Sequence, residues 1–427
     1  MRAMKDSGIE WIGQIPQGWH VDRLKYCADL DSEKLSEKTD PEYTFDYIDI
    51  SSVTEYGGIG NTQEMTFEKS PSRARIVVHD GDTIISTVRT YLKAIAYIDG
   101  LEDHICSTGF CVVTPNEKLH PKFGYFLLQS DYFVQKIVSE SVGVSYPAIS
   151  STEIGNMSIA IPMPEEQARI ACYLDAKCAE IDALIEAKER TNALLKERRQ
   201  SIIYEAVTKG LNPDAPMKDS GIEWIGQIPE HWTVKKIKYL GTFRNGLTYS
   251  PDNVTNEESG TLVLRSSNIQ NGNVVFDDNV YVDMDIPEIL QVAAGDILIC
   301  SRNGSRELIG KNAIIPENVK ASFGAFMMIF RCGDPKYLYY ILNSNVFSYY
   351  LGTFLTSTVN QLTAANFGNM KVVYCDSAEE REEIVAHLDQ KCEELDAAIS
   401  TNEATIQKLK EYRQSIIYEA VTGKIEV

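Results

Sequence analysis

The sequence MKDSGIEWIGQIP occupies Met4–Pro16 and returns unchanged at Met217–Pro229, 213 residues later. A second phrase, RQSIIYEAVT, occupies Arg199–Thr208 and returns at Arg413–Thr422. Both spacings are close to half of the 427-residue chain, far longer than the period of a solenoid repeat. The chain therefore contains two large copies of one unit. Each copy begins with the first phrase, here called the opening phrase, and ends with the second, the closing phrase.

Length and composition indicate two globular domains. A chain of 427 residues can bury two cores, and 44% hydrophobic and 24% charged residues are an ordinary globular balance. No apolar run approaches the roughly 20 residues of a membrane span, and the first residues lack the apolar segment of a signal peptide. We therefore expect a cytoplasmic protein. Its nine cysteines form no CxxC pair, and we expect reduced thiols, most of them buried.

The net charge of −20 restricts the ways in which this chain can bind nucleic acid. The acidic residues are spread along the chain rather than concentrated in a tail. A protein that binds DNA by itself normally has a basic surface. The charge therefore argues against a chain that clamps DNA without partners.

All four tryptophans lie in or just after the opening phrases, at Trp11, Trp19, Trp224 and Trp232. Large aromatic side chains mostly indicate burial, so we interpret these segments as a structural lid on a core. Stacking on a nucleic-acid base is the weaker alternative.

Between its two phrases, each copy has a variable body with the composition of a mixed α/β fold. Short β-branched runs predict strands at 43–50, 75–78, 83–86, 94–98 and 110–113, and at 261–264, 280–282, 297–300, 312–315 and 326–330. One aromatic stretch in each body, 123–138 and 337–350, is helix-like. The bodies share Gly-Asp at 81–82 and 295–296 and Gly-Asn-Met at 155–157 and 368–370, but differ almost everywhere else. The two copies are therefore expected to share one fold, although most residues between the shared motifs differ.

A long helix is expected after each body. Residues 165–208 and 379–422 each form 44 residues without Pro or Gly, which is about 66 Å of helix. Apolar residues follow the three-and-four spacing of a coiled-coil seam, at Ile170, Leu174, Ile181, Ile185, Leu195, Ile202, Ile384, Leu388, Leu395, Ile399, Ile406, Leu409 and Ile416. Polar residues interrupt this seam at Lys177, Lys188, Asn192, Arg199, Lys391, Asn402 and Arg413. The helices are interpreted as spacers, with a docking face for other subunits as the more specific hypothesis.

No motif for catalysis is found. Methyl transfer to a base would need a Gly-rich cofactor loop and a DPPY-like or PC motif, and neither is present. Residues 304–312, GSRELIGKN, only distantly resemble a phosphate loop, with one residue too many and Asn in place of Ser or Thr. There is no HExxH, and the six histidines form no pair with the spacing of metal ligands. We predict neither catalytic residues nor a metal site.

Polar, basic loops follow the Gly-Asp strands of both bodies. Arg and Asn side chains read guanine and adenine edges in the major groove, so these loops are candidates for DNA recognition. The candidate residues, including two earlier loops, are Arg73, Arg75, Arg89, Tyr91, Lys93, Arg265, Asn268, Arg302, Asn303, Arg306 and Lys311. For each residue the alternative is an ordinary solvated loop side chain.

These features together resemble the specificity subunit of type I DNA restriction-modification enzymes. The resemblance rests on GIEWIGQIP followed by Trp, the strand and loop at 81–86, IPMPEEQ at 161–167 and the closing phrases. The second copy lacks the IPMPEEQ motif at 372–377. The resemblance implies two target-recognition domains, 1–164 and 211–378, and two antiparallel helices, 165–210 and 379–427, related by a pseudo-two-fold axis.

The same resemblance implies the function and the partners. Each domain would read one half of a split, asymmetric DNA site, while the helices set the gap and bind two methyltransferase subunits. A motor-nuclease subunit would join them to cut unmodified DNA. The chain itself would be non-catalytic and bind no cofactor, because S-adenosylmethionine, ATP and Mg²⁺ would bind to the adenine-N6 methyltransferase and nuclease subunits. These partners would also supply much of the phosphate-binding surface that an acidic chain lacks.

Two other functions stay open. The chain could be a scaffold or decoy that binds methyltransferase subunits without reading DNA, which the acidic charge favours. It could also be the recognition subunit of a restriction-methylation enzyme of another type. The different Arg- and Asn-rich loops of the two copies favour the reading of two half-sites.

Overall fold

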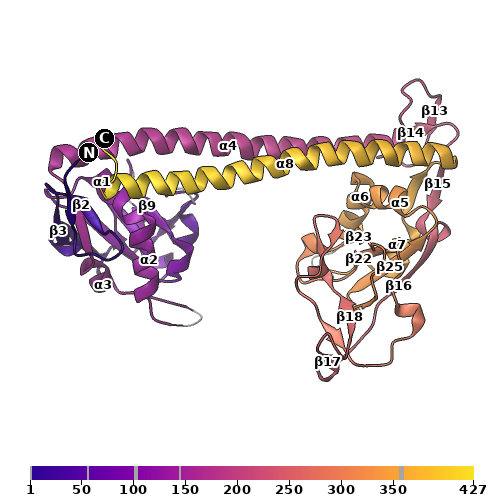
Figure 1. Ribbon diagram of the computed structural model, residues 1–427, viewed down its shortest axis with the longest axis horizontal. Coiled ribbons are helices and arrows are strands. Elements are labelled where there is room, and N and C mark those ends of the chain that lie inside the picture. Colours follow the sequence, from indigo (N-terminus) through magenta and orange to yellow (C-terminus); the bar gives the residue numbers. More distant parts are fainter. Residues whose placement is uncertain (1, 55–56, 101–103, 144–145, 355–359) are drawn as a thin grey trace. The chain divides into compact units, whose positions relative to one another are not determined.

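The computed structural model describes residues 2–54, 57–100, 104–143, 146–354 and 360–427, and the chain forms two compact units (Figure 1). Unit 1 comprises Met1–Glu189 together with Asn402–Val427, and unit 2 comprises Arg190–Thr401. The closing phrase of the second copy therefore belongs to unit 1, and that of the first copy belongs to unit 2. Each unit joins the opening phrase of one copy to the closing phrase of the other.

The body of unit 1 is built on two four-stranded sheets, with the orders β6-β5-β10-β7 and β4-β11-β8-β9. β5 and β10 are parallel, and the other neighbours in these sheets are antiparallel. Two antiparallel pairs, β1-β2 and β12-β3, complete the strands of this unit. The strands are β1 (Met4–Asp6), β2 (Gln14–Pro16), β3 (His20–Arg23), β4 (Ala28–Leu30), β5 (Thr44–Ile48), β6 (Gln63–Thr66), β7 (Ala74–Val77), β8 (Thr83–Ser86), β9 (Ile95–Tyr97), β10 (His104–Ser107), β11 (Phe110–Pro115) and β12 (Ser158–Ile161).

The body of unit 2 repeats the sheet β4-β11-β8-β9 strand for strand, but its other sheet differs, because the parallel pair lies at one edge instead of in the middle. Its sheets have the orders β17-β21-β18-β24 and β16-β25-β22-β23, and β18 and β24 are the parallel pair. The pairs β13-β14 and β15-β26 correspond to the smaller pairs of unit 1, and β19-β20 is an added hairpin. The strands are β13 (Met217–Asp219), β14 (Gln227–Pro229), β15 (Thr233–Lys236), β16 (Gly241–Asn245), β17 (Val254–Thr255), β18 (Thr261–Leu264), β19 (Ile269–Gln270), β20 (Asn273–Val274), β21 (Tyr281–Val282), β22 (Ile297–Cys300), β23 (Asn312–Ile314), β24 (Ala321–Phe323), β25 (Met327–Cys332) and β26 (Lys371–Tyr374).

Helices pack on both bodies in the same order. They are α1 (Pro121–Gln129), α2 (Asp131–Glu140) and α3 (Ser151–Gly155) in the first, and α5 (Pro335–Leu342), α6 (Asn345–Phe354) and α7 (Ala364–Asn369) in the second. The stretches predicted to be helix-like at 123–138 and 337–350 are helical, but each is divided into two helices, a break that the sequence pattern did not indicate. Ser130 Oγ donates to Leu127 O over 2.5 Å, and Ser344 Oγ donates to Ile341 O over 2.7 Å. Such local hydroxyl bonds compete with the helical pattern and favour an end of the helix.

The opening and closing phrases meet in the core of each unit. Trp19 and Trp232 are fully buried, as the lid interpretation predicts, whereas Trp224 is half-buried and Trp11 is 38% exposed, so the interpretation holds for one tryptophan of each copy. A Cβ on Gly423, which follows the second closing phrase, would lie 3.1 Å from the Trp19 ring. A Cβ on Gly210, just beyond the first closing phrase, would lie 3.3 Å from the Trp232 ring. Both glycines have positive φ, 68° and 74°, so they end the long helices in a left-handed turn against a tryptophan.

The two long helices are α4 (Pro164–Lys209) and α8 (Ala378–Val421), which agree closely with the predicted Pro- and Gly-free stretches 165–208 and 379–422, although α8 ends before residue 427. They pack antiparallel inside each unit: Arg413 on α8 binds Asp182 on α4 in unit 1, and Arg199 on α4 pairs with Asp396 on α8 in unit 2. The predicted polar interruptions Lys188 and Asn402 also meet, with Lys188 Nζ donating to Asn402 Oδ1 over 2.9 Å.

The predicted seam residues all lie in buried or half-buried positions. Buried are Ile170, Leu174, Ile181, Ile185, Ile384, Leu388, Ile399 and Ile416; half-buried are Leu195, Ile202, Leu395, Ile406 and Leu409. Ile170 to Ile185 share one hydrophobic core with body residues such as Phe123, so this face is not a seam between two helices alone. The closing phrases also bury Ile203 and Ile417, which the seam pattern missed.

Candidate nucleic-acid interface

The first recognition loop, residues 87–94, follows β8 and is fixed at its base by backbone contacts. Thr87 donates from both its N and its Oγ1 to Gly109 O, over 2.8 and 2.9 Å. Arg89 N donates to Pro147 O over 2.8 Å. Arg89 and Lys93 both have left-handed backbones, with φ of 51° and 52°, on either side of the short 3-10 helix Thr90–Leu92. The loop therefore projects a tight turn from the end of a buried strand.

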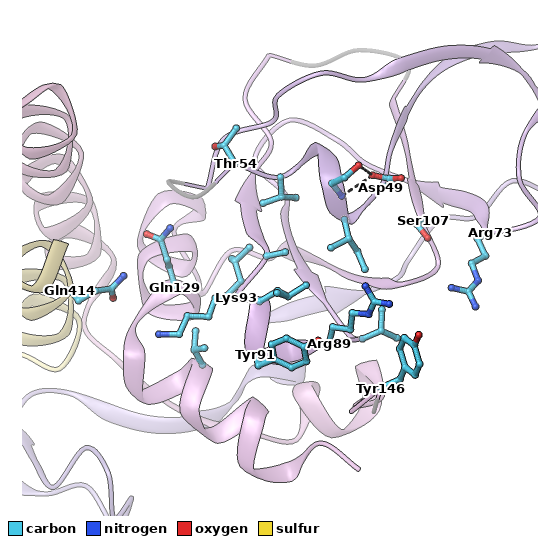
Figure 2. A pocket seen from close by; sticks show the side chains of 18 of the residues that line it. Asp49, Thr54, Arg73, Arg89, Tyr91, Lys93, Ser107, Gln129, Tyr146 and Gln414 are labelled. Carbon is cyan, nitrogen blue, oxygen red and sulfur yellow. Dashed lines mark hydrogen bonds between the residues drawn. The ribbon is translucent and has the colours of Figure 1, made fainter. Parts of the chain in front are cut away.

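The side chains of this loop make two different cation contacts, of which Figure 2 shows the one between Arg89 and Tyr146. The Arg89 guanidinium lies 4.8 Å from the centre of the Tyr146 ring, and both side chains are exposed. Lys93 Nζ forms an ion pair with Asp131 at 2.9 Å. Tyr91, between them, is exposed. A cation over an aromatic face is oriented without losing its hydrogen-bond donors, so Arg89 can still donate to a ligand.

A groove of about 1080 Å³ runs along this loop. Its lining includes Arg73 and Arg89 from the body and Gln414 from α8, all labelled in Figure 2. Lys410 and Arg413 of α8 line it as well. Arg413 is buried. Its Nε donates to Asp182 Oδ1 over 2.8 Å, and one of its terminal nitrogens donates to Gln129 Oε1 over 3.2 Å. The groove thus joins the recognition loop to residues in and next to the closing phrase.

The second recognition loop, residues 301–311, follows β22 at the equivalent place in unit 2. Ser301 donates from N and Oγ to Phe326 O, over 2.9 and 3.0 Å. The exposed Arg302 guanidinium lies 5.1 Å from the centre of the exposed Phe326 ring. Asn303 Nδ2 donates to Ser266 Oγ over 3.2 Å, and Asn303 Oδ1 accepts from Ser305 N over 2.9 Å. The arginine in each loop therefore lies against an exposed aromatic ring.

Two further candidates of this loop differ in accessibility. Arg306 is exposed, in the 3-10 helix Arg306–Leu308. Lys311 is half-buried, and its carbonyl accepts from Cys300 N over 2.8 Å, which ties the end of the loop to β22.

The earlier candidates in unit 1 lie beside the first recognition loop. Arg73 is exposed in the groove. Arg75 is half-buried, with its guanidinium 4.7 Å from the Phe67 ring centre, and it donates to Ala74 O over 2.7 Å. Arg73 is therefore accessible to a ligand, whereas Arg75 lies along the surface of its own body.

The earlier candidates in unit 2 make contacts within their own body. Arg265 forms an ion pair with Asp278 at 2.7 Å. Asn268 is fully buried: its Oδ1 accepts from Arg265 N over 2.9 Å and its Nδ2 donates to Val275 O over 3.1 Å. These contacts give Asn268 a structural role in the turn and leave its amide inaccessible to a ligand.

Sequence reasoning missed four residues of these surfaces. Tyr146 and Phe326, which lie against the loop arginines, are exposed aromatics in bodies whose other aromatic side chains are mostly buried or half-buried. Lys410 and Gln414 line the groove from α8. Gln414 belongs to the repeated closing phrase, and this repetition was the signal that the sequence offered. The helical pattern did not indicate that the face of α8 that carries Gln414 lies next to the first body.

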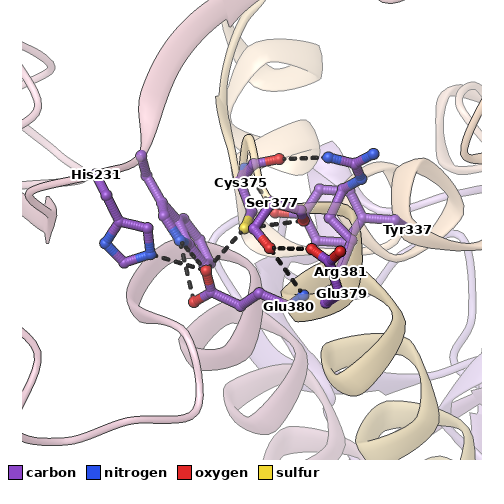
Figure 3. Close-up of polar contacts among 8 residues, drawn as sticks. His231, Tyr337, Cys375, Ser377, Glu379, Glu380 and Arg381 are labelled. Carbon is purple, nitrogen blue, oxygen red and sulfur yellow. Dashed lines mark hydrogen bonds and ion pairs between the residues drawn. The ribbon is translucent and has the colours of Figure 1, made fainter.

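A separate polar cluster surrounds Glu380 at the start of α8 (Figure 3). The Glu380 carboxylate lies 2.8 Å from His231 Nε2 and accepts from Trp232 Nε1 over 3.2 Å and from Cys375 Sγ over 3.0 Å. Burial opposes its charge, but these hydrogen bonds outweigh burial and hold the pKa of Glu380 below its usual value. Ser377 Oγ accepts from Glu380 N over 3.2 Å and caps the helix. This cluster defines the helix start that the sequence, lacking IPMPEEQ here, left open.

Cys375 in this cluster is a structural thiol. Burial and the adjacent Glu380 carboxylate raise its pKa to about 12, so the thiolate needed for nucleophilic chemistry is not formed near neutral pH. Burial likewise raises the pKa of Cys27 to about 11 and that of Cys111 to about 12. All nine cysteines are free, and Cys172 is the exposed one. Among the described residues no group of three or more His, Cys, Asp or Glu side chains is arranged to hold a metal ion.

No helix in the described parts of the chain has the length and apolar character needed to cross a membrane.

Comparison with known proteins agrees with this architecture. Residues 16–196 match the family model of the type I restriction modification DNA specificity domain. The specificity subunit of the type I restriction enzyme StySPI from Salmonella potsdam is 28% identical over 211 residues, 47% of this chain and 44% of the relative. The EcoKI specificity subunit from Escherichia coli K12 is 28% identical over 216 residues, again 47% of this chain and 44% of the relative. The chain thus matches less than half the length of these two relatives.

A solved structure matches over a longer span. A chain from a study of complex assembly and conformational transition of the type I R-M system superposes with a TM-score of 0.73. The match covers 96% of this chain and 99% of that one at 24% identity, so it supports the fold. Residues 16–196 are thus similar to the type I restriction modification DNA specificity domain, and the chain as a whole has the fold of the solved type I R-M chain.

Proposed function

We propose that this chain is the DNA sequence-recognition subunit of a type I restriction-modification system, and that each body reads one half of a bipartite, asymmetric DNA site. The observation that carries this proposal is the pair of recognition loops. They follow equivalent strands, β8 and β22, of two sheets with the same strand order. Their contents differ: the first offers Arg89, Tyr91 and Lys93, and the second Arg302, Asn303 and Arg306.

The chemistry of these loops suits base recognition. Arg binds guanine O6 and N7 with two hydrogen bonds, and Asn binds adenine N6 and N7 in the same way. Arg89 and Arg302 are exposed and oriented by Tyr146 and Phe326, so their donors are positioned in advance. Different donors at the same place in one fold predict two different half-sites.

The long helices are proposed to set the gap between the half-sites and to dock two methyltransferase subunits. Both helices carry one outward ion pair at equivalent positions, Lys177 with Glu180 and Lys391 with Glu394, each at 2.8 Å. Isolated surface pairs of this kind stabilise a helix little. Their repetition at equivalent positions is consistent with two surfaces, one on each helix, that bind two copies of the same partner.

Catalysis is proposed to reside in the partners. Adenine-N6 methyl transfer would use S-adenosylmethionine bound to the methyltransferase subunits, and DNA cleavage would use ATP and Mg²⁺ bound to the motor-nuclease subunits. This chain would supply sequence specificity. Its net charge of −20 agrees with such a division, because partner subunits can supply much of the contact to phosphates.

The main alternative is a scaffold or decoy that binds methyltransferase subunits without reading DNA. The net charge favours it, whereas the oriented arginines of the two recognition loops favour DNA recognition. A recognition subunit of another restriction-methylation type would share these loops. Neighbouring genes separate the two systems, because type I requires a methyltransferase gene with a DPPY motif and a helicase-nuclease gene.

The proposed function is tested by mapping methylated adenines across the genome in cells with and without this gene. We expect one bipartite, asymmetric motif to be methylated only when the gene is present. Identical methylation in both strains, with the partner genes expressed, would leave the scaffold or decoy as the better account.

A further inference from the structure

Exposed and half-buried positions that follow the opening phrase have mostly diverged between the two copies; the exceptions are Val21, which returns as Val234, and the pair Lys25-Tyr26. Gln17, Gly18, His20 and Asp22 become Glu230, His231, Thr233 and Lys235. Lys25-Tyr26, however, returns unchanged as Lys238-Tyr239. Tyr26 is 52% exposed and Tyr239 is 72% exposed, and both lysines are exposed as well. Core packing therefore does not explain why this pair is the same in both copies.

A shared turn holds an asparagine next to each Lys-Tyr pair. The pairs lie in the 3-10 helices Leu24–Tyr26 and Ile237–Tyr239. Leu24 N donates to Met157 O, and Ile237 N donates to Met370 O, both over 3.0 Å. These bonds connect each 3-10 helix to the shared Gly-Asn-Met sequence, whose asparagines, Asn156 and Asn369, are exposed.

The glycine of this turn is required for the close approach. A Cβ on Gly155 would lie 2.4 Å from Leu30 Cδ1 and 3.4 Å from Lys25 Cβ. A Cβ on Gly368 would lie 2.5 Å from the Phe243 ring and 3.4 Å from Lys238 Cβ. In both copies the turn therefore packs closely against the segment that carries the lysine, so the two bodies have the same local surface around the Lys-Tyr pair.

Positive charge is also retained at a neighbouring position. Arg23 is replaced by Lys236, which keeps the charge but not the guanidinium. In the part of the chain that the structure describes, Arg23, Lys25 and Lys238 form no ion pair. Lys236 Nζ donates to Asn369 Oδ1 over 3.3 Å. We define the first patch as Arg23, Lys25, Tyr26 and Asn156, and the second as Lys236, Lys238, Tyr239 and Asn369.

Each patch lies one short helix away from a recognition loop. Ile149 N donates to Thr87 O over 2.9 Å, and α3 then leads to Asn156. Leu362 N donates to Ser301 O over 2.7 Å, and α7 then leads to Asn369. A helix of five residues rises by about 7.5 Å. In each body, one continuous segment therefore contacts the recognition loop at its start and carries the asparagine of the patch at its end.

We propose that the two patches bind the phosphate backbone of DNA, one at each half-site. This inference rests on the proposed DNA recognition and adds its sequence-independent part. Two half-sites differ in their bases but present the same phosphates, so contacts to phosphate can be shared by both bodies. Lys, Arg, Tyr and Asn all donate to phosphate oxygens. Replacement of Arg by Lys keeps the positive charge but loses the bidentate hydrogen bonding that Arg can make to a base.

A docking face for a repeated protein subunit would also be the same in both copies. Lys25 Nζ lies 5.3 Å from the centre of the Tyr26 ring and Lys238 Nζ lies 5.2 Å from that of Tyr239, so each exposed lysine is held by its tyrosine without a neutralising carboxylate among the described residues. These cations and the adjacent recognition loops favour phosphate over such a partner. A protein-docking role is therefore treated as an outcome of the test.

The test uses the full chain in complex with its methyltransferase subunits, and the double variant Lys25→Gln, Lys238→Gln. Binding is measured by fluorescence anisotropy with a duplex that contains the methylated motif and with a scrambled duplex, from about 50 to 300 mM KCl. We expect the variant to weaken binding to both duplexes alike, by roughly tenfold per lysine near 0.1 M salt, and to lower the salt slope by about 2. The motif should stay unchanged.

The matched control is Lys38→Gln, Lys320→Gln, which removes the same charge from two other exposed lysines. Equal binding and salt slopes for the control and the patch variant would overturn the proposal. Unaltered DNA binding with loss of the methyltransferase subunits would overturn it in favour of a protein-docking face. If the unsubstituted complex binds the two duplexes equally, the proposed sequence recognition itself fails, which is a different result from failure of the patch alone.

Discussion

Arg413 and Asp182 form a buried ion pair between α8 and α4, with Arg413 Nε donating to Asp182 Oδ1 over 2.8 Å. The equivalent residues of the other copy, Arg199 and Asp396, lie 3.1 Å apart. The Arg413 and Asp182 side chains are 7% and 26% exposed, and those of Arg199 and Asp396 are 21% and 55% exposed. One interaction is thus repeated in two settings that differ in burial.

This difference predicts unequal effects of one substitution. Asp182→Asn leaves the buried Arg413 guanidinium without its counter-charge, which costs about 3 kcal/mol in a buried pair. Asp396→Asn should cost at most about 1 kcal/mol, because solvent screens the more exposed pair. Unfolding of the full chain, followed by hydrogen exchange in each unit, measures both. Equal destabilisation of the two units would contradict the burial argument.

The recognition loops predict separable effects on the two half-sites. Arg302→Ala should relax one half-site and Arg89→Ala the other, each by about 1–3 kcal/mol of discrimination if the contact has two hydrogen bonds. Methylation of a library of variant sites by the complex measures the discrimination at every position. A uniform loss across all sequences would assign these arginines to phosphate instead.

Asn303→Ala should relax the same half-site as Arg302→Ala, by a similar amount if Asn303 binds adenine. Its contacts to Ser266 and Ser305 also hold the loop. Ser266→Ala is the matched control, because it removes the contact to Asn303 and leaves the amide in place. Relaxation of equal size in the control would give Asn303 a structural role only.

The repeat made much of the fold predictable, because both phrases and both Pro- and Gly-free stretches are plain in the sequence. Strands β8, β18 and β22 have their predicted bounds, since each is a β-branched or apolar run that ends at a turn. The parallel partner strands β10 and β24 were missed, because neither His104–Ser107 nor Ala321–Phe323 has the alternation of a half-buried strand.

The candidate site was less predictable than the fold. Arg89 and Tyr146 are 57 residues apart in sequence, and nothing local indicates that they meet. Asn268 has the same sequence appearance as an exposed loop residue, but the turn that it caps is buried. Pairings over such distances depend on the packing of the whole body. The functional division of the chain at residues 164, 210 and 378 stays a prediction.

The long helices predict that the gap depends on their length. Four residues inserted after Asn192, and four at the equivalent Ile406, lengthen each helix by about 6 Å and roughly preserve its phase. About 6 Å is close to two base-pair steps. We expect the same two half-sites with a longer gap, whereas insertions of two residues should turn the apolar face away and abolish assembly. An unchanged gap in an active four-residue variant would assign spacing to the methyltransferase partners.

Glu380 predicts a pH-dependent contribution to stability. Its folded pKa is below the usual 4.5, so its contribution is fully present above about pH 4.5 and is lost as the pH falls through the folded value. Glu380→Gln should therefore destabilise the chain at pH 7, by roughly 1–3 kcal/mol for hydrogen bonds to a charged group. Thermal unfolding between pH 7 and pH 3.5 should show the difference from the unsubstituted chain shrinking with acid. A constant difference would contradict the assignment.

Exchange of one body tests most directly the claim that each body reads its own half-site. Residues 26–163 are replaced by the corresponding segment of a related chain with a different site, and methylated adenines are mapped across the genome. We predict that one half of the motif changes to that of the donor, while the other half and the gap stay the same. A motif in which both halves change together, or neither changes, would contradict the account.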